Sequence, residues 1–352
     1  MSGINQRFCK FAGTIKCDNL AIMSSNHGFW GKLKKPFFIQ APMADVTDAA
    51  FRRLIAKYGK PDVLYTEFVS ADGLMSPGRE VLLRDLIYTE EERPIVAQIF
   101  GSNPEKMEEA ARLCAERGFD GIDINMGCPD KNIEKQGSCA ALIKNLELAR
   151  EIVRAVKRGA ESARQRIPVS VKTRIGYNKN ELDTWLPALL AENPFTIILH
   201  ARTRKEMSDV PADWETIKQA VKIRDDLGSE TLIVGNGDVS DLEDARAKAR
   251  ASGCDGVMLG RAIFGNPFLF NTEKDISDLS INERLHVMLE HTKLFQELLG
   301  DIKSFAVMKK HYKAYVQGWD GAKELRIALM ATGSFEEVER VVMDYIESIG
   351  DK

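Results

Sequence analysis

The stretch Gly121-Ile-Asp-Ile-Asn-Met-Gly-Cys-Pro129 carries the clearest indication of the fold. Its first part, Gly121–Ile124, has the composition of a parallel strand buried on both faces. A tight Gly127-Cys128-Pro129 turn follows at once. In a (β/α)8 barrel the reactive groups lie in the segments that follow the strands. The stretch therefore predicts one strand of such a barrel, with a cysteine where a catalytic group would lie.

The same kind of short apolar run recurs along the chain, and amphipathic helical patterns separate the runs. The other strand candidates are Phe37–Ala41, Asp62–Thr66, Ile95–Ile99, Val169–Lys172, Thr196–Leu199, Thr231–Val234 and Gly256–Leu259. The helical patterns cover 48–58, 104–117, 146–163, 182–191, 214–226 and 242–251. Eight strands alternating with helices over about 235 residues predict a (β/α)8 TIM barrel. An open doubly wound sheet is the weaker alternative, because no Gly-x-Gly-x-x-Gly follows the first strand.

The alternation of strands and helices stops after Asn271, and this suggests a division of the chain. Residues 36–271 form the expected barrel domain, with a long segment at 67–93 that we expect near the active site. Residues 281–352 contain only helical patterns and are expected to form a small all-helical domain, which includes a helix over 303–318. Residues 1–35 are an N-terminal extension without an assigned role.

Composition excludes several classes of protein. The 352 residues carry a net charge of −3, and no apolar run approaches the roughly 18 residues of a membrane span. The N-terminus lacks the pattern of a secretory signal. Six irregularly spaced cysteines do not make a disulfide framework, so we expect a cytoplasmic protein. Cys9, Cys17 and His27 lack the spacing of a zinc site, and we expect no metal.

Two glycine turns at neighbouring strand ends predict a phosphate site. Gly235-Asn236-Gly237-Asp238 follows the seventh strand candidate, and Gly260-Arg261 follows the eighth. Glycine lets backbone N–H groups approach an anion, and a helix opening at Arg261 would favour a phosphate. The loops after strands seven and eight form the usual phosphate site of this architecture. Ordinary turn glycines are the alternative.

Polar side chains also end three of the remaining strands. Lys172 and Gln98 would point into the barrel mouth; if the phosphate belongs to a flavin, Lys172 would stabilise the reduced ring and Gln98 would bond its edge. His200 lies beside Arg202 and suits either a structural or a ligand-binding role. Solvated strand ends are the alternative for Lys172 and Gln98.

Two cysteines lie near the end of the fourth strand. Cys128, with an ordinary pKa of about 8.5, would be mostly protonated at neutral pH and able to give a proton. Cys139, in Gly137-Ser-Cys-Ala-Ala141, has small apolar neighbours and is expected to pack in the interior.

Together these residues make the chain similar to the tRNA-dihydrouridine synthases, flavin mononucleotide (FMN) enzymes that reduce a uracil base in tRNA. The matching segments, in family order over roughly residues 36–270, are APMADVTDAAFR (41–52), TEFVSADGL (66–74), QIFGSNP (98–104), GIDINMGCP (121–129), VKTRIG (171–176), HARTR (200–204), GNGD (235–238) and GRAIFGNP (260–267). The segment KKHYKAYVQGW (309–319) resembles part of the family's C-terminal domain. One departure is Gly137-Ser138-Cys139-Ala140, where the family usually has a glycine-rich run.

The resemblance implies a role for each matching residue. It implies that FMN contacts Pro42, Met43, Gln98, Lys172, His200, Asn236, Asp238, Gly260 and Arg261. NADPH would reduce the flavin, a hydride would pass from flavin N5 to uracil C6, and Cys128 would protonate C5 as the catalytic acid. Asn125 and Arg174 would lie near the base or its ribose, and we group Arg202 with them as substrate-binding. The base would have to leave its stack to reach the flavin.

The chain as a whole is not basic, but one local segment is, and this segment is our candidate for contact with tRNA. Residues 303–326 hold six Lys or Arg against two acids, and Lys309, Lys310 and Lys313 are spaced to share a helix face. An apolar stripe of Phe305, Met308, Tyr312, Tyr315 and Trp319 would dock this helix on the barrel. The lysines would then meet tRNA phosphates; a solvated basic face is the alternative.

Two other functions stay open for this sequence. The first is an FMN barrel oxidoreductase acting on a small molecule, similar to dihydroorotate dehydrogenase. The second is a non-catalytic RNA-binding protein that keeps the barrel as a scaffold. For the favoured enzyme we expect a monomer that acts on tRNA, with no membrane association and no obligate protein partner.

Overall fold

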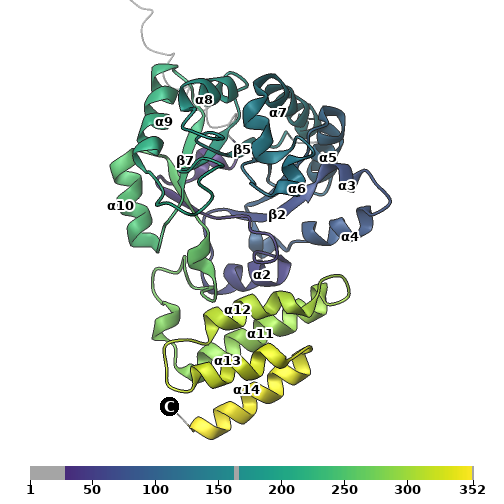
Figure 1. Ribbon diagram of the computed structural model, residues 1–352, viewed down its shortest axis with the longest axis vertical. Helices are drawn as coiled ribbons and strands as arrows, with labels where there is room; N and C mark the ends of the chain where they lie inside the picture. Colours follow the sequence, from purple (N-terminus) through teal and green to yellow (C-terminus); the bar gives the residue numbers. More distant parts are fainter. Residues whose placement is uncertain (1–27, 162–165, 351–352) are drawn as a thin grey trace, which may run out of the picture.

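The computed structural model describes residues 28–161 and 166–350, within which eight parallel strands form a closed barrel (Figure 1). The strands are β1 (Phe37–Gln40), β2 (Leu64–Ser70), β3 (Ile95–Phe100), β4 (Gly121–Met126), β5 (Val169–Arg174), β6 (Thr196–His200), β7 (Leu232–Asn236) and β8 (Gly256–Leu259). They pair in the order β1-β8-β7-β6-β5-β4-β3-β2. The Gln40 N–H donates to the Val63 carbonyl at 3.1 Å, and this contact helps to close the ring between β1 and β2. The predicted (β/α)8 barrel is confirmed.

Most strands extend further toward their carboxyl ends than the apolar runs predicted. β5 continues to Arg174, β6 to His200 and β7 to Asn236, and these three residues pair across the sheet in register. Ladder hydrogen bonds join backbone groups, so a polar side chain does not end a strand. The polar residues at the mouth of the barrel therefore project from the sheet itself, which holds them more rigidly than loops would.

Helices surround the barrel and connect its strands. They are α2 (Ala49–Tyr58), α3 (Ala71–Leu74), α4 (Arg79–Leu83), α5 (Pro104–Glu116), α6 (Lys131–Glu134), α7 (Leu146–Glu161), α8 (Leu182–Leu190), α9 (Glu215–Asp226) and α10 (Leu242–Ser252). Several begin at side-chain caps; for example, the Asp48 carboxylate accepts the Phe51 N–H at 3.0 Å. The long segment after β2 folds into α3, α4 and two short 3₁₀ turns.

Two apolar cores hold the barrel together. Inside the ring, large side chains such as Phe37, Tyr65 and Met258 fill the space and are almost wholly buried. Outside it, a larger core lies between the sheet and the helices. The polar mouth of the barrel therefore rests on a filled interior.

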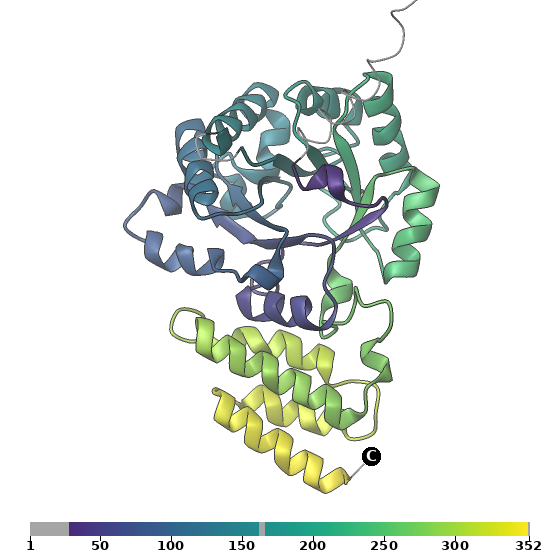
Figure 2. The same cartoon turned by 180° about the vertical axis from the view of Figure 1, so that it is seen from behind.

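Four helices follow the barrel and pack together at one side of it (Figures 1 and 2). They are α11 (Ile281–Leu299), α12 (Met308–Tyr315), α13 (Ala322–Ala331) and α14 (Phe335–Ile349). The sequence predicted one helix over 303–318, but α12 is shorter, because a 3₁₀ turn precedes it and Gly318 adopts a left-handed backbone after it (φ 91°). The expected apolar stripe is therefore divided: Met308, Tyr312 and Tyr315 are buried on α12, whereas the Trp319 indole bonds Tyr345 at 2.9 Å.

Apolar contacts join this helical unit to the barrel. The ring of Phe51 on α2 stacks on His291 of α11, with ring centroids 4.8 Å apart. Gly265 approaches α12 so closely that a β-carbon there would lie 2.6 Å from the Ala314 carbonyl carbon. His311 and Tyr315 are buried in the same contact.

A charged cluster near the barrel mouth also joins the two parts, and we call it the Lys303 cluster. The Lys303 ammonium lies 2.6 Å from Glu67, 3.0 Å from Asp85 and 3.9 Å from Asp45. The side chains of Lys303 and Glu67 are 14% and 6% exposed, so the charges of these two residues are largely withdrawn from water.

No described helix combines the length and apolarity that crossing a membrane requires. Within residues 28–161 and 166–350, no three His, Cys, Asp or Glu side chains gather as metal ligands would. Cys9, Cys17, His27 and most of the N-terminal extension lie outside the described residues.

Candidate active site

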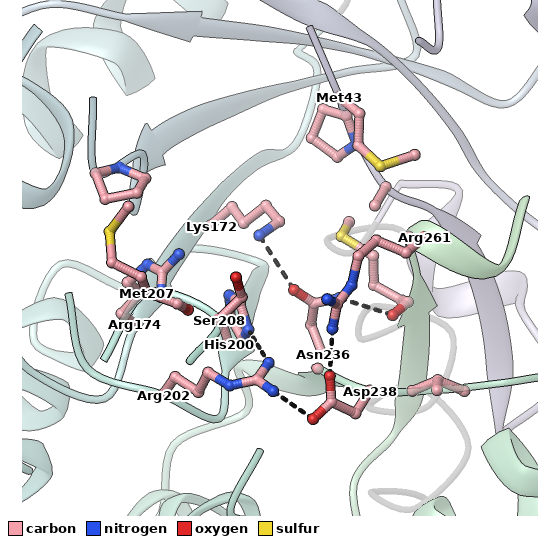
Figure 3. Close-up of a pocket in the computed structure, with 17 residues that line it drawn as sticks. Met43, Lys172, Arg174, His200, Arg202, Met207, Ser208, Asn236, Asp238 and Arg261 are labelled. Carbon is pink, nitrogen blue, oxygen red and sulfur yellow. Dashed lines mark hydrogen bonds and ion pairs between the residues drawn. The ribbon is translucent and has the colours of Figure 1, made fainter. Parts of the chain in front are cut away.

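A cavity of about 300 Å³ opens at the carboxyl ends of β1 and β5–β8 (Figure 3). Ten residues that the sequence singled out line it: Pro42, Met43, Lys172, Arg174, His200, Arg202, Asn236, Asp238, Gly260 and Arg261. They come from five strand ends that are far apart in the sequence. Sequence reasoning did not identify Met207, Ser208, Val239 or Met258, which add to the lining.

Lys172 on β5 is the central cation of the cavity. Its ammonium lies 3.3 Å from the Asn236 side-chain oxygen, and no carboxylate in the described residues lies within ion-pair distance. Burial, together with the charge of Arg174, lowers the pKa of Lys172 to about 8. An enclosed ammonium with one amide partner is a strong site for an anionic ligand atom.

Asp238, in the turn after β7, organises two arginines. Its carboxylate pairs with Arg202 from the β6 end and with Arg261 from the β8 end (Figure 3). A carboxylate would repel a phosphate, so Asp238 suits this site by holding the two guanidinium groups in place. Gly237 has a φ of 126°, and a β-carbon there would lie 3.1 Å from His200 Cδ2.

The β8 end differs from the expected helix start. Arg261 opens only a three-residue 3₁₀ turn, Arg261–Ile263. A single turn supplies little helix dipole, so an anion here would depend on the guanidinium groups and on backbone N–H groups.

His200 is neutral at physiological pH. Burial, with the charge of Arg174 next in effect, holds its pKa well below the ordinary range. Its Nε2 lies 3.2 Å from the Arg202 Nη1, which suits a neutral ring accepting from the guanidinium. His200 therefore fixes Arg202 and leaves the positive charge of the cavity on the lysine and arginines.

Gln98 and Asn125 lie in the interior beside this cavity and are not part of its lining. The Asn125 amide donates to the Gln98 oxygen at 3.0 Å, and the Gln98 amide donates to Asp123 at 2.7 Å. The Asn125 oxygen accepts the N–H groups of Gly127 and Cys128, at 3.0 Å each. Asn125 thus shapes the turn that carries Cys128, and the contacts of Gln98 and Asn125 with flavin or base stay predictions.

Cys128 has an acidity that its sequence did not reveal. We expected an ordinary thiol, but the pKa of Cys128 is lowered to about 7, chiefly because the Cys139 side chain hydrogen-bonds it. Cys139 was expected to pack, and it is fully buried. The N–H of the next residue, Ala140, donates to the Cys128 carbonyl at 3.3 Å, so the backbone beside Cys139 is bonded to the predicted catalytic residue. One indication of this was present in the sequence: Cys139 stands in a segment where the family usually has a glycine-rich run.

Two arginines fix the segment that carries Cys128. Arg174 donates to the Gly127 carbonyl at 2.8 Å. Arg204 pairs with Glu134 of α6 and donates to the Pro129 carbonyl at 3.3 Å. Arg204 lies in the segment HARTR (200–204), and its sequence pattern alone indicated no role for it. The segment after β4 is therefore tied to the ends of β5 and β6.

The three predicted RNA-contacting lysines lie outside the cavity, on α12. The Lys309 ammonium donates to the Met330 carbonyl at 2.8 Å, and Lys310 lies 3.6 Å from Asp45. Lys313 is exposed and has no ion-pair partner in the described part of the chain. These three lysines therefore differ in how freely they can meet a partner.

Comparisons with known proteins agree with this geometry. A family model described as dihydrouridine synthase (Dus) matches residues 39–349. A protein of Staphylococcus aureus (strain MRSA252) named probable tRNA-dihydrouridine synthase is 40% identical over 327 residues, covering 92% of this chain and 97% of that protein. Probable tRNA-dihydrouridine synthase 2 of Bacillus subtilis (strain 168) is 39% identical over 320 residues, covering 90% and 96%.

A solved structure of histamine dehydrogenase from Rhizobium sp. 4-9 matches with a TM-score of 0.50 at 14% identity. The match covers 73% of this chain and 48% of that one. At this identity the likeness concerns the fold alone.

Proposed function

The chain belongs to the dihydrouridine synthase family, and we propose that it uses a bound flavin to reduce the C5–C6 double bond of a uridine in tRNA. One observation carries the proposal beyond the family: the enclosed Lys172 ammonium, without a carboxylate partner in the described residues, at a cavity beside the Cys128 turn. The cation suits a reduced flavin, and the thiol suits proton transfer to carbon.

The chemistry of the cavity fits a flavin. Met43, Val239 and Met258 offer apolar surface for a ring system, and Lys172 offers positive charge for its electron-rich edge. Arg261, fixed by Asp238, would hold the phosphate with backbone N–H groups of the glycine turns. Arg202, which the sequence grouped with the substrate-binding residues, pairs with the same carboxylate, and we propose that it also faces the phosphate. One phosphate site of this kind supports FMN, and we propose NADPH as the reductant.

The protein's own part in the reaction would be to position the base and deliver a proton. When bound, the reduced flavin supplies the hydride that adds to C6 of the uracil. The Cys128 S–H bond breaks as its proton passes to C5, and the thiolate remains. A pKa of about 7 suits this step, because a general acid works best when its pKa lies near the operating pH. Arg174 lies beside this path, and we propose that it contacts the substrate.

We propose that tRNA meets the helical unit and the barrel together. The Lys303 cluster and the buried contacts of α2 with α11 support a fixed geometry between the two parts. Exposed lysines of α12 would contact phosphates while a flipped base enters the barrel mouth. A cytoplasmic monomer without an obligate protein partner is the simplest form of this enzyme.

Mass spectrometry of a defined, unmodified tRNA tests the proposed function. The tRNA is incubated with the purified protein and NADPH, and nucleoside mass is mapped to position. We expect one uridine to gain two hydrogens. No gain with a flavin-bound protein that NADPH reduces would contradict the proposal and favour a small-molecule oxidoreductase. A protein that binds tRNA but no flavin would favour the non-catalytic scaffold.

A Cys128→Ala variant tests the assigned proton donor in the same assay. We expect flavin content to be unchanged and turnover to fall by roughly 10²–10⁴-fold, the usual contribution of a general acid. Cys254→Ala is the matched control, since this buried thiol lies outside the cavity. Full activity of Cys128→Ala would remove Cys128 from the mechanism.

A further inference from the structure

Glu67 is a buried carboxylate near the carboxyl end of β2, outside the lining of the cavity. The pairing of β2 with β3 changes register beside it. Tyr65 lies opposite Val96, whereas Phe68 lies opposite Gln98, so β2 holds one more residue than β3 over this stretch. Such a β-bulge redirects a side chain, and bulges are common next to active sites. The direction of the Glu67 side chain is therefore set by an irregularity in the sheet.

One oxygen of Glu67 holds the turn 43–47, which follows β1. The Asp45 N–H donates to Glu67 Oε1 at 2.6 Å. Asp45 has a φ of 55°, in the left-handed region that residues with a β-carbon rarely adopt. The Val46 and Thr47 N–H groups close the same turn, because they donate to the Met43 carbonyl at 3.1 and 3.0 Å. Since Met43 lines the cavity, Glu67 holds the backbone that presents it there.

The other oxygen of Glu67 is bound by the helical unit. The Lys303 ammonium, in the segment between α11 and α12, donates to Glu67 Oε2 at 2.6 Å. Lys303 also lies 3.0 Å from Asp85 and 3.9 Å from the Asp45 carboxylate. Within the described residues, Asp85 makes no hydrogen bond to the turn 43–47. The hydrogen bonds that connect the helical unit to this turn therefore pass through Glu67.

We propose that Glu67 is a positioning residue for the flavin: one carboxylate oxygen holds the turn that presents Met43, and Lys303 of the helical unit holds the other oxygen. The inference rests on the proposed function, because it takes Met43 as a flavin contact. Hydrogen bonds to a charged group are shorter and stronger than those between neutral groups, and Glu67 makes two at 2.6 Å. The docked helical unit therefore helps to set the shape of the flavin site.

The dissociation constant (Kd) of FMN tests this inference. The flavin-bound full chain is diluted over a range of concentrations, and the fluorescence of released FMN gives the Kd. This readout needs neither tRNA nor NADPH, so it distinguishes a failure of this inference from a failure of uridine reduction. Circular dichroism checks that each variant is folded at the temperature of the measurement. A full chain that binds no FMN would overturn the inference and the proposed function together.

Three substitutions separate the hydrogen bond to the turn from the ion pair with Lys303. Glu67→Leu removes both, and Glu67→Gln keeps an oxygen that can accept the Asp45 N–H. Asp85→Asn removes a carboxylate from Lys303 without touching the turn. We expect Glu67→Leu to raise the Kd about tenfold, a loss typical of one hydrogen bond to a charged group. Glu67→Gln should recover most of this affinity, and Asp85→Asn, the matched control, should leave the Kd unchanged.

Lys303 gives the second test, because its effect on the flavin should depend on Glu67. We expect Lys303→Met to raise the Kd about threefold by itself and to add nothing further in combination with Glu67→Leu. Additive effects would overturn the inference, and so would equal Kd values for Glu67→Leu and either Glu67→Gln or Asp85→Asn. Thr47→Val keeps the Lys303 cluster and removes the hydroxyl that accepts the Met43 N–H at 2.9 Å. An unchanged Kd in this variant would also overturn the inference, even if Glu67→Leu does not fold.

Discussion

Two lysines near the barrel mouth, Lys172 and Lys303, are withdrawn from water in opposite ways. Lys303 has carboxylates at 2.6, 3.0 and 3.9 Å, and their attraction outweighs burial and raises its pKa. Lys172 has one amide oxygen at 3.3 Å, and burial lowers its pKa to about 8. A paired buried cation stabilises the fold, whereas an unpaired one costs stability and keeps its charge available to a ligand.

Removing the charge of Lys303 tests the first half of this comparison. We expect Lys303→Met to lower the free energy of unfolding by about 3–5 kcal/mol, because the buried Glu67 and the half-buried Asp85 would lose their cation. Denaturant unfolding measures the change. Lys57→Met is the matched control: its pair with Glu290 also joins barrel and helical unit, but it is exposed and should contribute less than about 1 kcal/mol. Equal losses for the two variants would break the comparison.

Removing the charge of Lys172 tests the second half. We expect Lys172→Met to lower the rate of uridine reduction by roughly 10²–10³-fold, as the loss of one preorganised electrostatic contact does in other enzymes. The free energy of unfolding should stay the same or rise, since the substitution removes a desolvated charge. Bound flavin is read from its visible absorbance. A loss of stability as large as that of Lys303→Met would show that Lys172 is a structural cation.

Stability at alkaline pH should separate the two lysines further. Between pH 8 and about 10.5 the unfolded chain keeps the Lys172 proton and the folded flavin-free protein does not, so the free energy of unfolding rises with pH. The rise is on the order of 3 kcal/mol. Lys303, whose pKa is raised, adds constant stability over this range and loses it only above about 10.5.

The pH effect is measured as the difference in unfolding free energy between the unmodified protein and Lys172→Met. Other titrating groups contribute equally to both proteins and cancel in this difference. The difference in unfolding free energy should shrink toward zero as the pH rises. A difference that does not change with pH would mean that Lys172 keeps its proton when buried.

We expect the smallest effect, a change in tRNA binding, from the lysines of α12. They again offer one unpaired and one paired lysine, but at the surface. Lys313 is unpaired within the described residues, whereas Lys310 faces Asp45 at 3.6 Å. We expect Lys313→Ala to reduce the salt slope of tRNA binding by roughly one, and Lys310→Ala to reduce it less. Binding titrations over a series of salt concentrations measure both slopes. Unchanged slopes would mean that tRNA contacts another surface.

Much of the site was predicted because its signals are local in the sequence. Ten of the residues singled out line one cavity, since each ends a strand run and the strands of a barrel meet at one face. The helix expected at Arg261 was wrong, because the chain makes only a short turn there. The ends of α12 were also missed, because an apolar stripe can continue in space after the helix itself has ended.

The amino-acid sequence by itself determined the barrel, the strand-end residues and the all-helical segment after them, because apolar periodicity and glycine turns act over a few residues. Only the tertiary structure decided which charges are paired and how acidic Cys128 is. Lys303 lies 236 residues from Glu67, and Cys139 reaches Cys128 only after the chain has turned through α6. Burial and proximity set these energies, and both exist only once the ring has closed.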